Sequence, residues 1–152
     1  MAKEGLFNIL NNRYSFEDSS VLDLFSGTGN ISFEFASRGS TTITAVDSHA
    51  GCVKFISKTS KDLEFPIDIV KMDVFRFLER TKMQYDIIFA DPPYHFIEEQ
   101  FLKIPELVLK NKLLGEDGVL IVEHSPQTQL ESHPNFSEKR KYGSSVFSFF
   151  EN

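Results

Sequence analysis

The sequence has one cysteine and no tryptophan, and it lacks any apolar run of the roughly 18 residues that a membrane helix needs. A lone cysteine, Cys52, cannot form a disulfide within the chain, which excludes a disulfide-bonded scaffold and fits a reducing cytoplasm. The first residues, MAKEG, are polar and lack the apolar core of a signal peptide. We therefore expect a cytoplasmic protein without membrane contacts.

Positive charge is also scarce, with 16 Lys and Arg against 22 Asp and Glu and a net charge of −6. Tight, non-specific binding of nucleic acid depends on many contacts between basic residues and phosphates, so this balance argues against it. The one dense basic stretch is Lys139-Arg140-Lys141. Solvated charges that protect an edge strand explain this stretch better than a functional patch does.

The remaining composition is that of a globular protein, with 152 residues and 41% apolar content. These values predict a single domain over 1–152, and nothing in them demands more than a monomer. Apolar runs alternate with helical patterns along the chain. The expected strands are SSVLDLFSG, TTITAVD, FPIDIVKMD, YDIIFADPP and DGVLIVEHS, and the expected helices lie at 3–12, 30–39, 48–63, 74–82 and 97–114.

Several details of these elements can be predicted. Asn30 should cap the second helix, which should stop at Gly39. Pro105 should begin a fresh helix within 97–114. The buried face of the third helix should carry Cys52, Val53, Ile56 and Leu63. The tail over 136–152 alternates about a YGSS turn, which predicts an antiparallel hairpin.

Alternating strands and helices predict an α/β fold with an open, doubly wound, mostly parallel sheet. Ligands of such sheets bind beyond the carboxyl ends of the strands, near the point where the strand order reverses. The turns after the first four strands are therefore the candidate site.

The turn after the first strand reads DLFSGTGN, with Gly27 and Gly29 on either side of Thr28. Glycines here allow the backbone to approach a ligand closely, although a tight turn alone would also use them. A dinucleotide-binding turn would have a third glycine or alanine where Ser32 stands, and a P-loop would have a lysine. The turn therefore has neither the complete dinucleotide-binding signature nor the complete P-loop signature.

Carboxylates end the next two strands. Asp47 follows Gly27 by 20 residues, where an acidic side chain can accept hydrogen bonds from ribose hydroxyls. Asp73 could accept a hydrogen bond from an adenine amino group. Either residue could instead be the N-cap of the helix that follows it. Together this rim suits a nucleoside-containing cofactor that needs no phosphate contacts.

The turn after the fourth strand reads ADPPY, and its prolines make it stiff and extended. An amino group on a nucleobase is a poor nucleophile because its lone pair is delocalised into the ring. Acceptors for both N–H bonds would activate it, and the Asp91 carboxylate and the Pro92 carbonyl could provide them. Pro93 keeps the turn rigid, and Tyr94 offers a ring on which a base can stack. A simple turn remains the structural alternative.

These residues resemble a known family. DLFSGTGN, AVDSHA, KMDVF and FADPPY occur in the order found in class I S-adenosylmethionine-dependent methyltransferases with a D/N-P-P-Y/F motif. More narrowly, KEGLFNIL, LLGEDGVLIVEH and RKYGSSVFSFFE are similar to the bacterial methyltransferases that modify guanine N2 in 16S ribosomal RNA. The resemblance covers essentially the whole chain.

The resemblance implies a Rossmann-like, seven-stranded sheet whose last strand is antiparallel, and S-adenosylmethionine as cofactor. It implies that Asp91, Pro92, Pro93 and Tyr94 hold the target base of ribosomal RNA, either free or within an assembling small subunit. Members of the family usually carry a basic segment with an Arg-Pro-Thr element before the first helix, whereas this chain starts at the helix. The implied cofactor contacts are Asp23, Phe25, Ser26, Gly27, Thr28, Gly29, Asn30, Asp47, Ser48, Asp73, Val74 and Asp91.

Other functions stay open at this point. A transferase acting on adenine N6 or on protein glutamine would use the same turn, because an amide or amino nitrogen poses the same chemical problem. A nicotinamide oxidoreductase would share the sheet and Asp47 but leaves Asp91 to Tyr94 unexplained. A non-catalytic RNA-binding or assembly module could keep the fold. His49 and Cys52 lie one helical turn apart without further ligands, so we expect no metal site.

Overall fold

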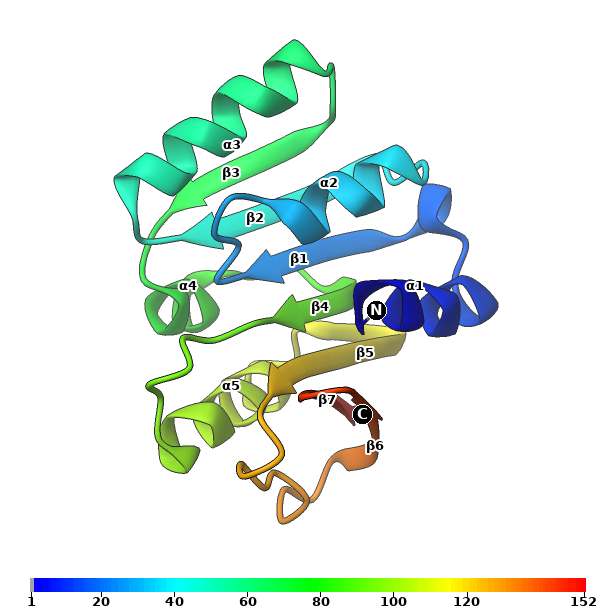
Figure 1. Ribbon diagram of the computed structural model, residues 1–152, viewed down its shortest axis with the longest axis vertical. Helices are drawn as coiled ribbons and strands as arrows, with labels where there is room; N and C mark the ends of the chain where they lie inside the picture. The colour runs from blue at the N-terminus through cyan, green and yellow to red at the C-terminus, as the bar shows by residue number, and fades with distance from the viewer. Residues whose placement is uncertain (1) are drawn as a thin grey trace.

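The computed structural model describes residues 2–152, which form a seven-stranded sheet with helices on both faces (Figure 1). The class predicted from the alternating pattern, α/β with a mostly parallel sheet and an antiparallel C-terminal hairpin, is confirmed. A short 3₁₀ helix, Phe16–Asp18, precedes the first strand. The main elements are α1 (Ala2–Arg13), β1 (Ser20–Leu24), α2 (Asn30–Ser37), β2 (Thr42–Asp47), α3 (Ala50–Asp62), β3 (Ile67–Lys71), α4 (Val74–Arg80), β4 (Tyr85–Ala90), α5 (Glu98–Lys110), β5 (Leu114–His124), β6 (Phe136–Tyr142) and β7 (Ser145–Phe150).

The strand order is β3-β2-β1-β4-β5-β7-β6. The first five strands in this order are parallel, and β7 is antiparallel to both of its neighbours. The order reverses between β1 and β4, so the crevice expected to bind a ligand lies beyond the carboxyl ends of these two strands. Leu24 pairs with Ala90, and Ala90 pairs with Val122, which brings the turns after β1, β4 and β5 side by side.

Both faces of the sheet are buried, which explains why the central strands are apolar without alternation. On one face α4 and α5 pack against Leu22, Ile88 and Leu120. On the other, α1 and α2 pack against the alternate positions of the same strands, such as Val21 and Ile87. The predicted first helix is confirmed.

Aromatic contacts fix α1 on the sheet. The Phe7 and Phe35 ring centroids lie 4.7 Å apart, and Phe16 closes the group from 6.0 and 5.5 Å. Edge-to-face pairs of this kind stabilise a core by roughly 0.5–1.5 kcal/mol each beyond the area they bury. This packing holds the amino end of α1 beside the crevice.

Three details of the predicted helices are wrong. Asn30 is the first residue of α2 rather than its cap, because Gly29 occupies the cap in a left-handed conformation that its missing Cβ permits. Pro105 lies inside one continuous α5, where burial of Ile104 and Val108 outweighs the hydrogen bond that proline cannot donate. Leu63 is 53% exposed, because α3 ends at Asp62 and Leu63 no longer follows the helical repeat.

One further boundary is wrong: α5 ends at Lys110 rather than continuing to Leu114, because Leu114 begins β5 and pairs with Tyr85 of β4. The remaining boundaries agree closely with expectation. Gly39 follows the end of α2 in a left-handed conformation, and the face of α3 is buried at Ile56 and half-buried at Cys52 and Val53. The basic stretch lies exposed on β6, the edge strand, as the protective interpretation requires. Lys139 pairs with Glu131 and Arg140 with Glu138. Within residues 2–152, no helix has the length and apolar character to span a bilayer.

Candidate active site

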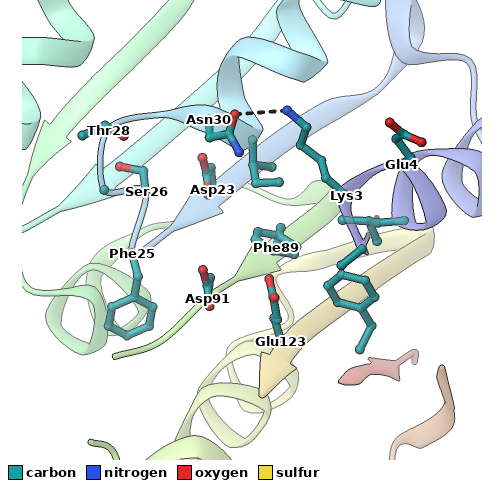
Figure 2. A pocket seen from close by; sticks show the side chains of 15 residues that line it. Lys3, Glu4, Asp23, Phe25, Ser26, Thr28, Asn30, Phe89, Asp91 and Glu123 are labelled. Atoms are coloured by element: carbon teal, nitrogen blue, oxygen red, sulfur yellow. Dashed lines mark hydrogen bonds between the residues drawn. The ribbon is translucent and has the colours of Figure 1, made fainter. Parts of the chain in front are cut away.

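Two adjoining cavities lie beyond the carboxyl ends of the parallel strands, with volumes of about 660 and 330 Å³. Phe25 and Asp91 line both, so the two cavities meet at these side chains. Figure 2 shows the larger cavity between the turn after β1 and the ends of β4 and β5. The predicted residues that line it are Asp23, Phe25, Ser26, Gly27, Thr28, Asn30 and Asp91, and those that line the smaller cavity are Phe25, Asp47, Ser48, Asp73, Val74, Asp91 and Pro93.

Three predicted residues lie outside both cavities. Gly29 is buried at the start of α2, where a Cβ would come within 2.9 Å of Ile56. Pro92 is buried just after the end of β4. Tyr94 is 99% exposed, and its ring points into solvent. These residues shape the site or extend it outward rather than line it.

The turn after β1 has left-handed backbone conformations that hydrogen bonds hold in place. Phe25 and Gly27 both have a φ of 56°, and the amide of Ser26 donates to the Val46 carbonyl at 3.0 Å. A Cβ added at Gly27 would meet no atom of the described residues within 4 Å. The turn therefore leaves open space directly over the glycine.

The left-handed conformation of Phe25 places its ring among other aromatic side chains. Its centroid lies 6.3 Å from that of Phe75 and 5.6 Å from that of Phe96. Phe96 also lines the smaller cavity. This gives the smaller cavity an apolar, aromatic wall that the sequence patterns did not single out.

Asp47 fixes the glycine turn rather than capping a helix. One of its oxygens accepts from the Gly27 amide at 2.8 Å, and the other accepts from the His49 amide at 2.8 Å. The cap of α3 is His49, whose Nδ1 accepts from the Cys52 amide at 3.2 Å. The alternative role of Asp47 as an N-cap is therefore wrong, and its carboxylate faces the smaller cavity.

Asp73 is both the N-cap of a helix and a residue of the smaller cavity. It caps α4 by accepting from the Arg76 amide at 3.0 Å, and it also lines the smaller cavity. A carboxylate oxygen has two lone pairs, so a cap can still accept a hydrogen bond from a ligand.

Asp23 is buried at the end of β1 and accepts a 2.7 Å hydrogen bond from the Ser32 hydroxyl. Burial raises the pKa of Asp23 to about 7, although the Ser32 hydrogen bond lowers it in part. Ser32 occupies the place where a dinucleotide-binding turn has its third glycine. The Ser32 hydroxyl therefore orients the Asp23 carboxyl group by a hydrogen bond.

Asp91 and Glu123 extend into the larger cavity from the ends of adjacent strands (Figure 2). Water reaches Asp91 through the mouth of the cavity, but the surrounding protein and the charge of Glu123 raise its pKa to about 6. Burial also raises the pKa of Glu123, against a hydrogen bond from Ser145. The motifs did not identify Glu123, because a lone carboxylate in VLIVEH carries no signal of its own.

No cation neutralises this pair of carboxylates within residues 2–152. Lys3 lies on the wall of the cavity but donates to Asn30 at 3.1 Å (Figure 2). It also forms an ion pair with Glu34 at 3.3 Å. The electrostatic potential of the cavity is therefore negative, and the cavity suits a cationic ligand or a group that presents N–H donors.

Comparison with known proteins supports the resemblance. The family model described as Conserved hypothetical protein 95 matches residues 1–151. "Ribosomal RNA small subunit methyltransferase D" of Buchnera aphidicola from Baizongia pistaciae is 28% identical over 80% of this chain and 61% of its own length. The protein of the same name from Haemophilus influenzae is 26% identical over 97% of this chain and 77% of its own. The chain thus spans less than two thirds of the first of these relatives.

Solved structures show the same fold. The 16S rRNA N2 G1207 methyltransferase of Thermus thermophilus, in complex with AdoMet and guanosine, superposes with a TM-score of 0.80 and 22% identity. The match covers 99% of this chain and 42% of that one. The sheet and its helices therefore have the same fold as this methyltransferase.

Proposed function

The chain belongs to the family described as Conserved hypothetical protein 95, and from this premise we propose that it is an S-adenosylmethionine-dependent methyltransferase of ribosomal RNA. More narrowly, we propose that it methylates the exocyclic N2 of a guanine in 16S RNA, as a monomer. The names of the curated relatives support the small-subunit RNA, and the guanosine complex of the same fold supports the base.

The residues of the two cavities fit S-adenosylmethionine. The smaller cavity combines aromatic Phe25 and Phe96 with the carboxylates of Asp47 and Asp73, which matches an adenine ring, its amino group and the ribose hydroxyls. The open space over Gly27 admits a ligand at the backbone. In the larger cavity the buried Ser26 hydroxyl has no hydrogen-bond partner among the described residues, which a ligand would satisfy.

Each cofactor residue has a proposed task. Asp23, the turn from Phe25 to Thr28, and Asn30 hold the methionine part, with Gly29 shaping the turn. Asp47 and Ser48 hold the ribose, and Asp73 with Val74 holds the adenine. When bound, S-adenosylmethionine supplies a methyl group on a positively charged sulfur. The electronegative cavity stabilises that charge.

The chain itself orients and activates the nucleophile. The Asp91 carboxylate and the Pro92 carbonyl accept the two N–H bonds of the amino group, which directs its lone pair toward the methyl carbon. Pro92 and Pro93 keep these acceptors in place, and the exposed Tyr94 ring stacks on the base. As the nitrogen gains its methyl group it loses a proton, to Asp91 or to water.

The observation that carries the proposal is the convergence of Asp91 and the glycine turn on one cavity. A nicotinamide oxidoreductase would leave Asp91 without a task. A non-catalytic RNA-binding module would not need a carboxylate such as Asp91 beside open space for a cofactor.

Transfer to ribosomal RNA tests the proposal. We expect the protein to transfer a labelled methyl group from S-adenosylmethionine to 16S RNA isolated from a strain that lacks the gene. Digestion and mass spectrometry should identify N2-methylguanosine, and Asp91→Ala should abolish the signal while S-adenosylhomocysteine still binds. N6-methyladenosine would redirect the proposal to adenine, and the absence of transfer would favour a non-catalytic module.

A further inference from the structure

Glu123 is a carboxylate of the larger cavity to which the proposed reaction gives no task. It lies at the end of β5, half-buried, on the wall that also contains Phe147. No Lys, Arg or His of the described chain neutralises it. Ser145 donates one hydrogen bond to Glu123, which leaves the other lone pairs of this half-buried carboxylate for a ligand that supplies a donor or a positive charge.

The strand order separates Glu123 from the cofactor residues. Across the sheet the rim carries Asp73 after β3, Asp47 at the end of β2, the glycine turn after β1, Asp91 after β4 and Glu123 at the end of β5. The proposed adenine, ribose and methionine contacts lie on the β3 side of Asp91. Glu123 lies on the opposite side of Asp91 in the strand order and lines the same cavity as Asp91, so a base held by Asp91 can reach it.

Asp91 and Glu123 each follow the last pair of the β4–β5 ladder. Ala90 pairs with Val122, Asp91 is the first residue after β4, and Glu123 is the residue after Val122 in β5. Both side chains enter the same cavity (Figure 2), and the charge of Glu123 acts on Asp91. The site therefore presents two carboxylate acceptors side by side.

Two adjacent carboxylates are complementary to the hydrogen-bonding edge of guanine but not to that of adenine. Guanine presents an N1–H donor beside the two N–H bonds of N2, so it can donate to both carboxylates at once. Adenine presents an unprotonated N1, itself an acceptor, beside its N6 amino group. A carboxylate facing that N1 would be repelled unless it took up a proton.

From this arrangement we propose that Glu123 accepts a hydrogen bond from guanine N1–H while Asp91 holds the N2 amino group, so that Glu123 selects guanine over adenine. This inference rests on the proposed function, because it assigns the base recognised by the same site. Glu123 is then a specificity residue that contacts the substrate rather than the cofactor.

A single base analogue tests the role. 2-Aminopurine keeps the N2 amino group but has an unprotonated N1, so it removes the proposed donor and leaves the reacting nitrogen. The substrate is 16S RNA ligated from synthetic strands, with guanine or 2-aminopurine at the nucleotide that mass spectrometry identifies as methylated. The quantity measured is the ratio of kcat/KM for guanine to that for 2-aminopurine.

The wild-type protein should prefer guanine by about 100-fold or more, because a site built for a donor rejects an analogue that lacks it. In Glu123→Gln the amide can accept from guanine N1–H or donate to the N1 of 2-aminopurine, so the ratio should fall at least about tenfold. Glu123→Asp keeps the charge and should retain a preference for guanine. The control Glu116→Gln removes the same charge from an exposed position at the other end of β5 and should leave the ratio unchanged.

Binding of S-adenosylhomocysteine distinguishes the outcomes. A reduced ratio with unchanged cofactor affinity in Glu123→Gln supports the inference. An unchanged ratio, or a loss of cofactor affinity, overturns it while leaving the methyltransferase proposal in place. If the wild-type protein methylates adenine, or neither base, the proposed function and this inference fail together. Thermal unfolding of each variant shows whether it has folded.

Discussion

Three carboxyl groups at the ends of adjacent strands share a raised pKa, and burial is the main cause in each. They are Asp23, Asp91 and Glu123. Carboxyl groups in folded proteins more often have lowered pKa values, because partners stabilise their charge. At the residue scale, the site therefore has three carboxyl groups that no cation of the described residues neutralises, which a cationic cofactor and an amino group would complement.

The pKa of Asp91 predicts how activity depends on pH. The ionised carboxylate is a stronger acceptor than the protonated acid and can stabilise positive charge developing on the nitrogen, so kcat/KM should rise with pH through about 6 and then level off. Asp91→Asn should lower kcat/KM by roughly 100- to 1,000-fold and remove this rise, because the amide does not titrate. Methyl transfer measured from pH 5 to 8 checks both effects. A rise through pH 6 that persists in Asp91→Asn would assign the titration to another group.

The pKa of Asp23 predicts how stability depends on pH. The folded protein retains the Asp23 proton up to about pH 7, whereas the unfolded chain loses it near the ordinary value of 3.8. The unfolded state therefore binds fewer protons across this window, and the free energy of unfolding should fall as pH rises from about 4 to 7. Asp23→Asn should flatten this slope, by an amount on the order of a few kcal/mol over the window.

Denaturant unfolding at several pH values, without cofactor, measures that slope. Asp91 and Glu123 also contribute to it, so it should become shallower in Asp23→Asn rather than vanish. A slope identical to that of the wild-type protein would show that Asp23 is already ionised in the folded state.

At the scale of elements, the turn from β1 to α2 does most to shape the site. Its glycines differ in purpose, since Gly29 is packed against Ile56 and Phe33 whereas Gly27 faces open space. The hydrogen bond from Gly27 to Asp47 ties this turn to the end of β2. The turn is thus rigid where the helix begins and open where a ligand would lie.

Two glycines with similar backbone geometry allow an effect on cofactor binding to be distinguished from an effect on stability. Gly27 has a φ of 56° and Gly143, in the β6–β7 turn, has a φ of 61°, and neither Cβ would meet a described atom within 4 Å. Gly27→Ala and Gly143→Ala should therefore each lower stability by about 1 kcal/mol. Only Gly27→Ala should weaken S-adenosylhomocysteine binding, measured by calorimetry. Equal affinities in the two variants would place the cofactor away from this turn.

The sequence predicted the elements well where local patterns determine them. Apolar runs identified the central strands, and the alternating tail identified the hairpin. Asn30 and Pro105 were misassigned because tertiary packing overrode local preference, in the tight entry at Gly29 and in the buried face of α5. Element boundaries set by packing cannot be predicted from one stretch of sequence.

At the scale of the whole molecule, the reversal of strand order explains where the site lies. The alternation of strands and helices was enough to predict that the turns after β1 to β4 would meet at one edge. The partnership of Asp91 with Glu123 could not be predicted, because it depends on the register of β4 and β5. The placement of Phe25 near Phe96 likewise depends on the fold rather than on a motif.

The central claim is that the cofactor and Asp91 meet in one cavity, and a crystal structure of the protein with S-adenosylhomocysteine tests it most directly. An amino nitrogen must lie about 3 Å from both the methyl carbon and the Asp91 carboxylate, so the ligand sulfur should lie within about 8 Å of Asp91. The adenine should occupy the smaller cavity beside Asp73. A sulfur more than about 12 Å from Asp91, or a ligand outside both cavities, would contradict the account, because no single nitrogen could then reach both groups.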